Sequence, residues 1–104
     1  MATPFRTRLK NGETLLGTMA TMPSVPNMEI LAEIGFDWLF IDAEHGPLSN
    51  ESLLTMLSAV GDKTATLVRT RAPEEDQIKQ ALDLGATGII APQVNSHDQA
   101  AAVV

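Results

Sequence analysis

Several features that many proteins rely on are missing from this sequence, and their absence limits what the chain can be. It contains no cysteine, which excludes disulfide bonds, thiolate zinc sites and iron–sulfur clusters built from its own residues. No apolar run approaches the roughly 20 residues of a transmembrane helix. The first residues, Met1 to Lys10, have no apolar stretch of the kind found in a secretory signal. These absences lead us to expect a soluble protein of the cytoplasm.

Positive charge is also scarce. The chain has 7 Lys and Arg against 13 Asp and Glu, which gives a net charge of −6. Because nucleic acids and anionic lipids attract basic surfaces, neither nucleic acid nor a membrane is an expected partner. The 104 residues, of which 44% are hydrophobic and 19% are charged, instead suit one small folded domain.

Short apolar runs predict four β-strands, near residues 15–19, 38–41, 66–69 and 88–91. The second run, WLFI, has four apolar residues in succession and no alternation with polar ones. Such a run is typical of a strand that is covered on both faces, as strands of parallel sheets are.

Apolar residues at helical spacing predict a helix after each strand. We expect the first helix to be capped by Asn27 and to end at Gly35. Pro73 suits the first turn of the third helix, and Ser96 with Gln99 forms a capping box for the fourth. The expected buried stripes of the first three helices are Ile30, Leu31 and Ile34; Leu53, Leu54, Leu57 and Val60; and Ile78, Ala81 and Leu82.

The predicted order is therefore βαβαβαβα, with about 24 residues from one strand to the next. Regular units of this length suit the α/β fold of a TIM (β/α)8 barrel, whose typical size is about 250 residues. Four units make up the N-terminal half of such a barrel. An open doubly wound sheet is the alternative, but no glycine-rich phosphate loop follows the first strand.

Ionisable residues follow the predicted strands at the edge where active sites of βα proteins lie. Asp42, Glu44 and His45 come after the second strand, and Arg69 ends the third. Two acids, a histidine and an arginine on one rim suit proton transfer beside an anionic oxygen. Arg71, two residues further on, is expected to pair with a surface acid.

Each of these residues also has a structural explanation, and the sequence leaves both open. Asp42 can cap a turn, Glu44 can be a solvated loop acid, His45 an ordinary loop histidine, and Arg69 the partner of a surface acid. Their joint placement on one rim favours function. Asp83 breaks a local rule, because its negative charge lies in the last turn of the third helix, at the negative end of the helix dipole.

The sequence resembles the HpcH/HpaI aldolases in six segments that follow one another through nearly the whole chain: residues 11–12 (NG), 35–38 (GFDW), 42–47 (DAEHGP), 67–69 (LVR), 77–85 (QIKQALDLG) and 92–94 (PQV). Members of that family cleave 4-hydroxy-2-oxo acids or 2-keto-3-deoxy sugar acids to pyruvate and an aldehyde. The resemblance implies a lyase that uses a divalent metal, Mg, Mn or Co, to stabilise the enolate of pyruvate.

The resemblance also implies roles for single residues. His45 matches the histidine that moves the proton of the substrate hydroxyl, and Arg69 matches the arginine that holds the pyruvyl oxygen. Asp42 and Glu44 match acids near that histidine and the metal-bound water. Asp83 matches an aspartate that increases the basicity of the histidine, although the end of a barrel helix is expected to face away from the catalytic rim.

By the same resemblance, residues 1–104 are a partial barrel domain that is truncated at the C-terminus. The metal ligands of the family are a Glu and an Asp from later strands, beyond Val104, and its members assemble as hexamers. An inactive half-barrel that only associates with a partner or with itself is therefore the alternative function. A barrel of the phosphoenolpyruvate mutase/isocitrate lyase type would need acid-rich motifs that the sequence lacks.

Overall fold

Four short strands form one parallel sheet whose order follows the chain. They are β1 (Gly17–Ala20), β2 (Trp38–Asp42), β3 (Ala65–Arg69) and β4 (Gly88–Ile90), in the order β1-β2-β3-β4. The structure is a computed structural model that describes residues 3–46 and 48–104. Pro47, the last residue of the segment at 42–47, lies outside the described residues.

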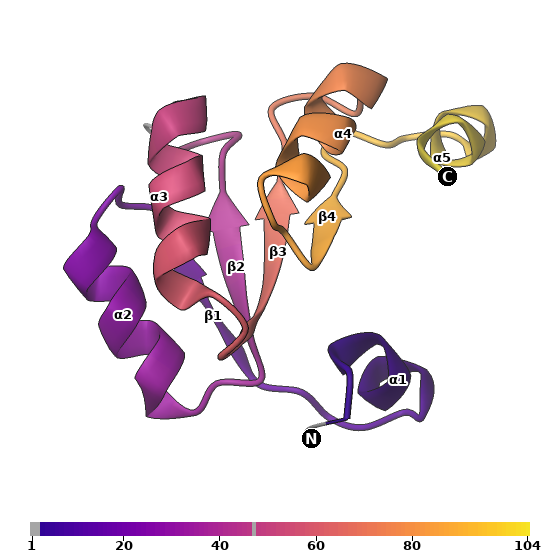
Figure 1. Ribbon diagram of the computed structural model, residues 1–104. Coiled ribbons are helices and arrows are strands. Elements are labelled where there is room, and N and C mark those ends of the chain that lie inside the picture. Colours follow the sequence, from indigo (N-terminus) through magenta and orange to yellow (C-terminus); the bar gives the residue numbers. More distant parts are fainter. Residues whose placement is uncertain (1–2, 47) are drawn as a thin grey trace.

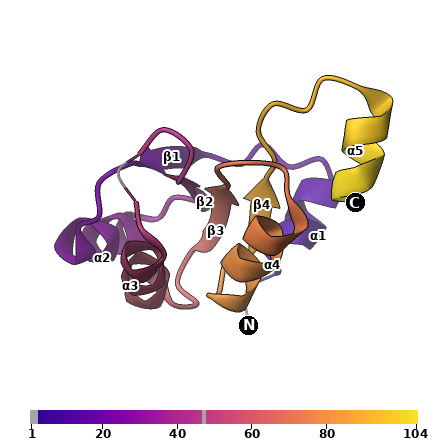
Figure 2. The same ribbon diagram turned by 90° about the horizontal axis from the view of Figure 1, so that it is seen from above.

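Three helices cover one face of this sheet (Figures 1 and 2). They are α2 (Val25–Ile34), α3 (Asn50–Val60) and α4 (Glu75–Asp83), and each connects one strand to the next. A final helix, α5 (His97–Val103), follows β4. Four parallel strands that alternate with helices form the N-terminal half of a TIM barrel, so the predicted fold is confirmed.

The core lies between the sheet and the helices. Leu39, Ile41 and Val68 of the strands and Met28 and Met56 of the helices are all 0% exposed. Burying a side chain of this size stabilises the fold by about 1.5–3 kcal/mol. In the described part of the chain, no helix combines the length and the apolar character that crossing a membrane requires.

The opposite face of the sheet carries a second row of apolar residues. Met19, Phe40 and Leu67 are register partners on neighbouring strands and therefore share this face. Met19 is 54% exposed. In a complete barrel this face lines the interior, and here it also carries the side chains that end β2 and β3.

A short helix, α1 (Phe5–Lys10), contacts one end of this inner face. The sequence pattern did not predict it. The Phe5 ring lies 6.4 Å from the Trp38 ring, and Trp38 lies 6.1 Å from Phe40. Trp38 also packs over Gly17, where an added Cβ would lie 2.5 Å from the indole. A helix of six residues has too few turns to show an apolar periodicity, which is why the sequence did not indicate it.

Two predictions about α2 are wrong. Its N-cap is Ser24, whose hydroxyl accepts from the backbone N–H of Asn27, because proline is tolerated in a first turn and the helix can start earlier. Its most buried residues are Met28 and Ala32, whereas Ile30 and Ile34 are each 60% exposed. Ile30 and Ile34 of the predicted stripe therefore face away from the core, whereas Leu31 packs against it as predicted. The helix α2 lies at one end of the helix layer, which leaves this side of it uncovered (Figure 1).

The later helices agree with the predictions in most respects. Leu54 and Leu82 are exposed, but the remaining predicted residues of α3 and α4 are buried or half-buried. The start of α4 differs, because Glu74 is the N-cap and Pro73 lies before the helix. The hydroxyl of Ser96 caps α5 by accepting from the N–H of Gln99 at 3.1 Å, as predicted, although the Gln99 side chain accepts from Asn95 instead of Ser96.

Candidate active site

Asp42 and Arg69 form the centre of the site because they end neighbouring strands at the same register position. Arg69 donates from Nη2 to Oδ2 of Asp42 at 2.6 Å and from Nε to Oδ1 at 3.1 Å. Two parallel charge-assisted bonds of this kind hold both groups in one orientation. The Arg69 guanidinium also lies 5.1 Å from the centre of the Phe40 ring, which places it on the inner face of the sheet.

Asp42 also shapes the loop that follows β2. Its Oδ1 accepts from the backbone N–H of Glu44 at 3.0 Å and of His45 at 3.1 Å. The Arg69 guanidinium, followed by these backbone N–H groups, lowers the pKa of the 3% exposed Asp42 carboxyl to about 2, against the opposing effect of burial. Asp42 is therefore ionised at neutral pH and organises both the arginine and the loop. The same pairing raises the pKa of Arg69.

His45 is the exposed member of the cluster, with 68% of its side chain accessible. Its Nδ1 lies 2.9 Å from Arg69 Nη2, and its Nε2 lies 3.4 Å from Glu44 Oε1. A guanidinium can only donate, so Nδ1 is the acceptor and the proton of a neutral His45 ring lies on Nε2, facing Glu44. On the Nδ1 side of the ring, Oδ2 of Asp42 lies 3.7 Å from Nδ1.

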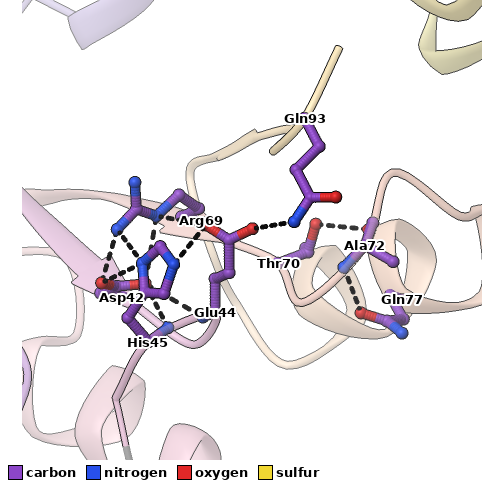
Figure 3. A network of polar contacts seen from close by, with 8 residues as sticks. All are labelled: Asp42, Glu44, His45, Arg69, Thr70, Ala72, Gln77 and Gln93. Carbon is purple, nitrogen blue, oxygen red and sulfur yellow. Dashed lines mark hydrogen bonds and ion pairs between the residues drawn. The ribbon is translucent and has the colours of Figure 1, made fainter.

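Glu44 connects this cluster to the end of a third strand. Its side chain is only 10% exposed, and its Oε1 lies 3.5 Å from Arg69 Nε. Its Oε2 accepts from Nε2 of Gln93 at 3.3 Å (Figure 3). The structure therefore brings together all four predicted rim residues, and it adds Gln93 from the loop after β4, which the sequence analysis did not single out.

The expectation for Arg71 is wrong. Instead of pairing with a surface acid, it donates to the backbone carbonyl of Leu48 at 2.7 Å and so ties the loop after β2 to the end of β3. The next residues are held by a bond from Thr70 to the Ala72 carbonyl and by one from the Ala72 N–H to Gln77 (Figure 3). A cavity of about 180 Å³ lies beside them, between α3 and α4.

Asp83 is the predicted site residue that the structure does not bring to the others. It is the last residue of α4, which runs from the carboxyl end of β3 back to the start of β4. The cluster around His45 lies at the opposite edge of the sheet, where the strands end. Within the described part of this chain, no contact joins Asp83 to His45, and its suggested influence on the histidine stays a prediction.

The described residues do not by themselves fit a metal centre. No group of three His, Asp or Glu side chains among them is arranged to hold an ion. Both oxygens of Asp42 are already engaged by Arg69, and Oδ1 also accepts two backbone N–H groups, which leaves little free acceptor capacity for a cation. The arrangement is an arginine, a histidine and two carboxylates in mutual contact, groups that can chemically support proton transfer beside an anionic oxygen.

Fold and candidate site together define half of a βα barrel whose strand ends carry a His–Arg–carboxylate cluster. A family model described as HpcH/HpaI aldolase/citrate lyase matches residues 20–104. The chain belongs to this family, as the resemblance of its motifs indicated.

Single relatives agree. The chain is 39% identical over 102 residues to 4-hydroxy-2-oxovalerate aldolase of Rhodococcus jostii (strain RHA1), a match that covers 96% of this chain and 40% of that enzyme. It is 36% identical to 2-keto-3-deoxy-L-rhamnonate aldolase of Escherichia coli O1:K1 / APEC, covering 100% of this chain and 39% of that enzyme.

A solved structure agrees as well. An HpcH/HpaI aldolase/citrate lyase family protein from Burkholderia cenocepacia J2315 superposes with a TM-score of 0.86 at 32% identity, over 94% of this chain and 40% of that one. The chain thus spans about two-fifths of the length of the curated relatives it matches.

Proposed function

We propose that this chain supplies the His–Arg half of the active site of a metal-dependent aldolase, which cleaves a 4-hydroxy-2-oxo acid or a 2-keto-3-deoxy sugar acid to pyruvate and an aldehyde. The observation that carries the proposal is the contact of Arg69 with both Asp42 and His45, at 2.6 and 2.9 Å. It joins a cation that can hold an oxo acid to a group that can accept a proton.

In the proposed reaction, Arg69 binds an oxygen of the 2-oxo acid and releases Nδ1 of His45. The freed Nδ1 lone pair takes the proton of the substrate hydroxyl at C4. The electrons of that O–H bond form the aldehyde carbonyl, the C3–C4 bond breaks, and its electron pair becomes the enolate of pyruvate. Arg69 stabilises the enolate oxygen, and the return of the proton from Nδ1 of His45 to C3 completes pyruvate and restores the neutral ring.

The two carboxylates support this proton transfer. After His45 accepts the proton, its Nδ1–H can turn to Asp42 Oδ2, which lies 3.7 Å away. Oε1 of Glu44 lies 3.4 Å from Nε2 of His45 and holds the imidazole ring in its orientation while Nδ1 reacts. Asp42 is suited to this role because its low pKa keeps it ionised throughout.

The divalent metal belongs to the proposal through the resemblance to the family. When bound, such an ion supplies a Lewis acid for the oxo group. We assign no step of this mechanism to it, because the described residues do not form its site. The cytoplasm is the proposed compartment.

The proposal is tested in a fusion in which Val104 is followed by the later strands of the Rhodococcus jostii relative. With Mn or Co present, pyruvate release from a 4-hydroxy-2-oxo acid is expected to fall about 100-fold or more in His45→Ala and in Arg69→Ala. His97→Ala is the matched control, because His97 is 94% exposed on α5, and its rate is expected to stay unchanged. Equal rates in all the variants would refute the site assignment.

The 104 residues alone are expected to release no pyruvate, because they lack a metal site among the residues described. Metal-dependent turnover by the isolated chain would contradict this expectation. A second candidate function, association through the inner face of the sheet, is favoured by the 54% exposure of Met19, which ends an apolar row at the edge strand β1. Sedimentation of the isolated chain tests it, since a stable monomer would refute association of the chain with itself.

A further inference from the structure

Gln93 has an unusual backbone conformation, and its side chain contacts a residue of the candidate site. Its φ is +54°, and it is the only non-glycine residue with a positive φ in the described part of the chain. A side chain disfavours this region because Cβ crowds the neighbouring carbonyl, whereas glycine adopts it without that cost. A glutamine at such a position suggests that its side chain is used.

The Gln93 side chain reaches a residue that is distant in sequence. Its Nε2 donates at 3.3 Å to Oε2 of Glu44, 49 positions earlier in the chain. A carboxylate can only accept, so the amide NH2 must face Glu44 and the orientation of the carboxamide is defined. Figure 3 shows Gln93 approaching Glu44 from the side opposite to His45 and Arg69.

This contact determines how Glu44 presents its two oxygens. Oε2 is taken by Gln93, so Oε1 faces Nε2 of His45 at 3.4 Å and Nε of Arg69 at 3.5 Å. Without Gln93, Oε2 loses its hydrogen bond, and the carboxylate can rotate about its last bond because both remaining contacts are made by Oε1. Nε2–H of His45 would then lose its nearest acceptor.

We propose that Gln93 is a positioning residue, held in a left-handed backbone conformation so that its carboxamide orients Glu44 toward His45 and Arg69. The effect on turnover rests on the proposed aldolase function, whereas the orienting contact does not. Gln93 itself needs no contact with substrate. In the fusion described above, Gln93→Gly is expected to lower kcat roughly threefold to tenfold with little change in KM.

Two substitutions separate the side chain from the backbone. Gln93→Gly adopts the same φ more easily, so it keeps the loop and loses the amide. Gln93→Asn keeps an amide and tolerates a positive φ, but it is one methylene too short to reach Glu44. Both variants are expected to fold. The melting temperature of Gln93→Gly is expected to equal or exceed that of the parent chain.

The direct test is NMR of the chain with labelled Glu and His. We expect both variants to shift the side-chain carboxyl signal of Glu44 and the ring signals of His45, while the ring signals of His97 stay unchanged. If the Glu44 and His45 signals are the same in the parent chain and in Gln93→Gly, the proposal is overturned. If His45→Ala leaves turnover unchanged but the NMR shifts occur, the aldolase assignment fails and the positioning contact stands.

Discussion

The Asp42–Arg69 pair gives the most quantitative prediction, which concerns the substitution Asp42→Asn. The folded chain holds the pKa of Asp42 near 2, against an ordinary value of 3.8, and its side chain is 3% exposed. At about 1.36 kcal/mol for each pKa unit, that difference corresponds to roughly 2.5 kcal/mol of folding free energy at neutral pH. Asparagine keeps the shape but loses the charge, so the variant should be less stable by about that amount.

The contribution of Asp42 to the unfolding free energy should decrease as the pH falls. Because the folded pKa lies below the unfolded one, the stabilisation is complete above about pH 4 and is lost as the pH falls toward about 2. The difference in unfolding free energy between the parent chain and Asp42→Asn should therefore shrink from about 2.5 kcal/mol to nearly zero across that window. Urea unfolding, followed through the fluorescence of Trp38, the single tryptophan, measures it at each pH.

Asp62→Asn is the matched control, because Asp62 is an exposed acid in the turn after α3. Its effect should stay within about 0.5 kcal/mol at every pH. The reasoning is refuted if Asp42→Asn costs the same at about pH 2 as at about pH 6, since the loss would then come from packing and not from the ion pair.

Four further substitutions, two of them expected to leave the histidine signals unchanged, test how the site is supported. Gly46→Ala should lower the unfolding free energy by about 2–3 kcal/mol and shift the ring signals of His45, because the added Cβ would lie 2.5 Å from the carbonyl oxygen of Asp42. Gly85 has a positive φ and open space around it, so Gly85→Ala should lower the unfolding free energy by about 1 kcal/mol and leave the His45 signals unchanged. Arg71→Met should cost about 1 kcal/mol in urea unfolding and broaden the loop signals, because it removes the bond that ties the loop after β2. Met56→Ala should cost about 3 kcal/mol, since Met56 is 0% exposed, without changing the histidine signals.

The strands and the meeting of Asp42 with Arg69 could be predicted from the sequence because both depend on local order. A run such as residues 38–41 is apolar throughout, since a parallel strand is covered on both faces, and its end is marked by the first charged residue. Parallel strands bring their carboxyl ends to one edge, so Asp42 and Arg69 had to meet once the strands were placed. Their register in the sheet, one directly beside the other, confirms that argument.

The buried face of α2 could not be predicted in the same way. Ile30 and Ile34 are as apolar as Met28, and periodicity cannot tell which side of a helix faces the sheet when both sides carry apolar residues. The answer depends on the neighbours of the helix. In this chain α2 packs against α3 on one side only, so a second apolar side remains exposed.

The contribution of Gln93 was hidden for a different reason. Its identity gives no sign of a positive φ, because glutamine rarely adopts one, and the four residues of the rim are explained without it. Only the three-dimensional path of the loop after β4 brings its amide to Glu44. The sequence shows which residues carry charge, but the orientation of a carboxylate depends on its uncharged neighbours. For this site, a substitution at Gln93 is therefore a more sensitive test of the side-chain geometry than a substitution at Asp42, whose place at the end of β2 was already indicated by the sequence.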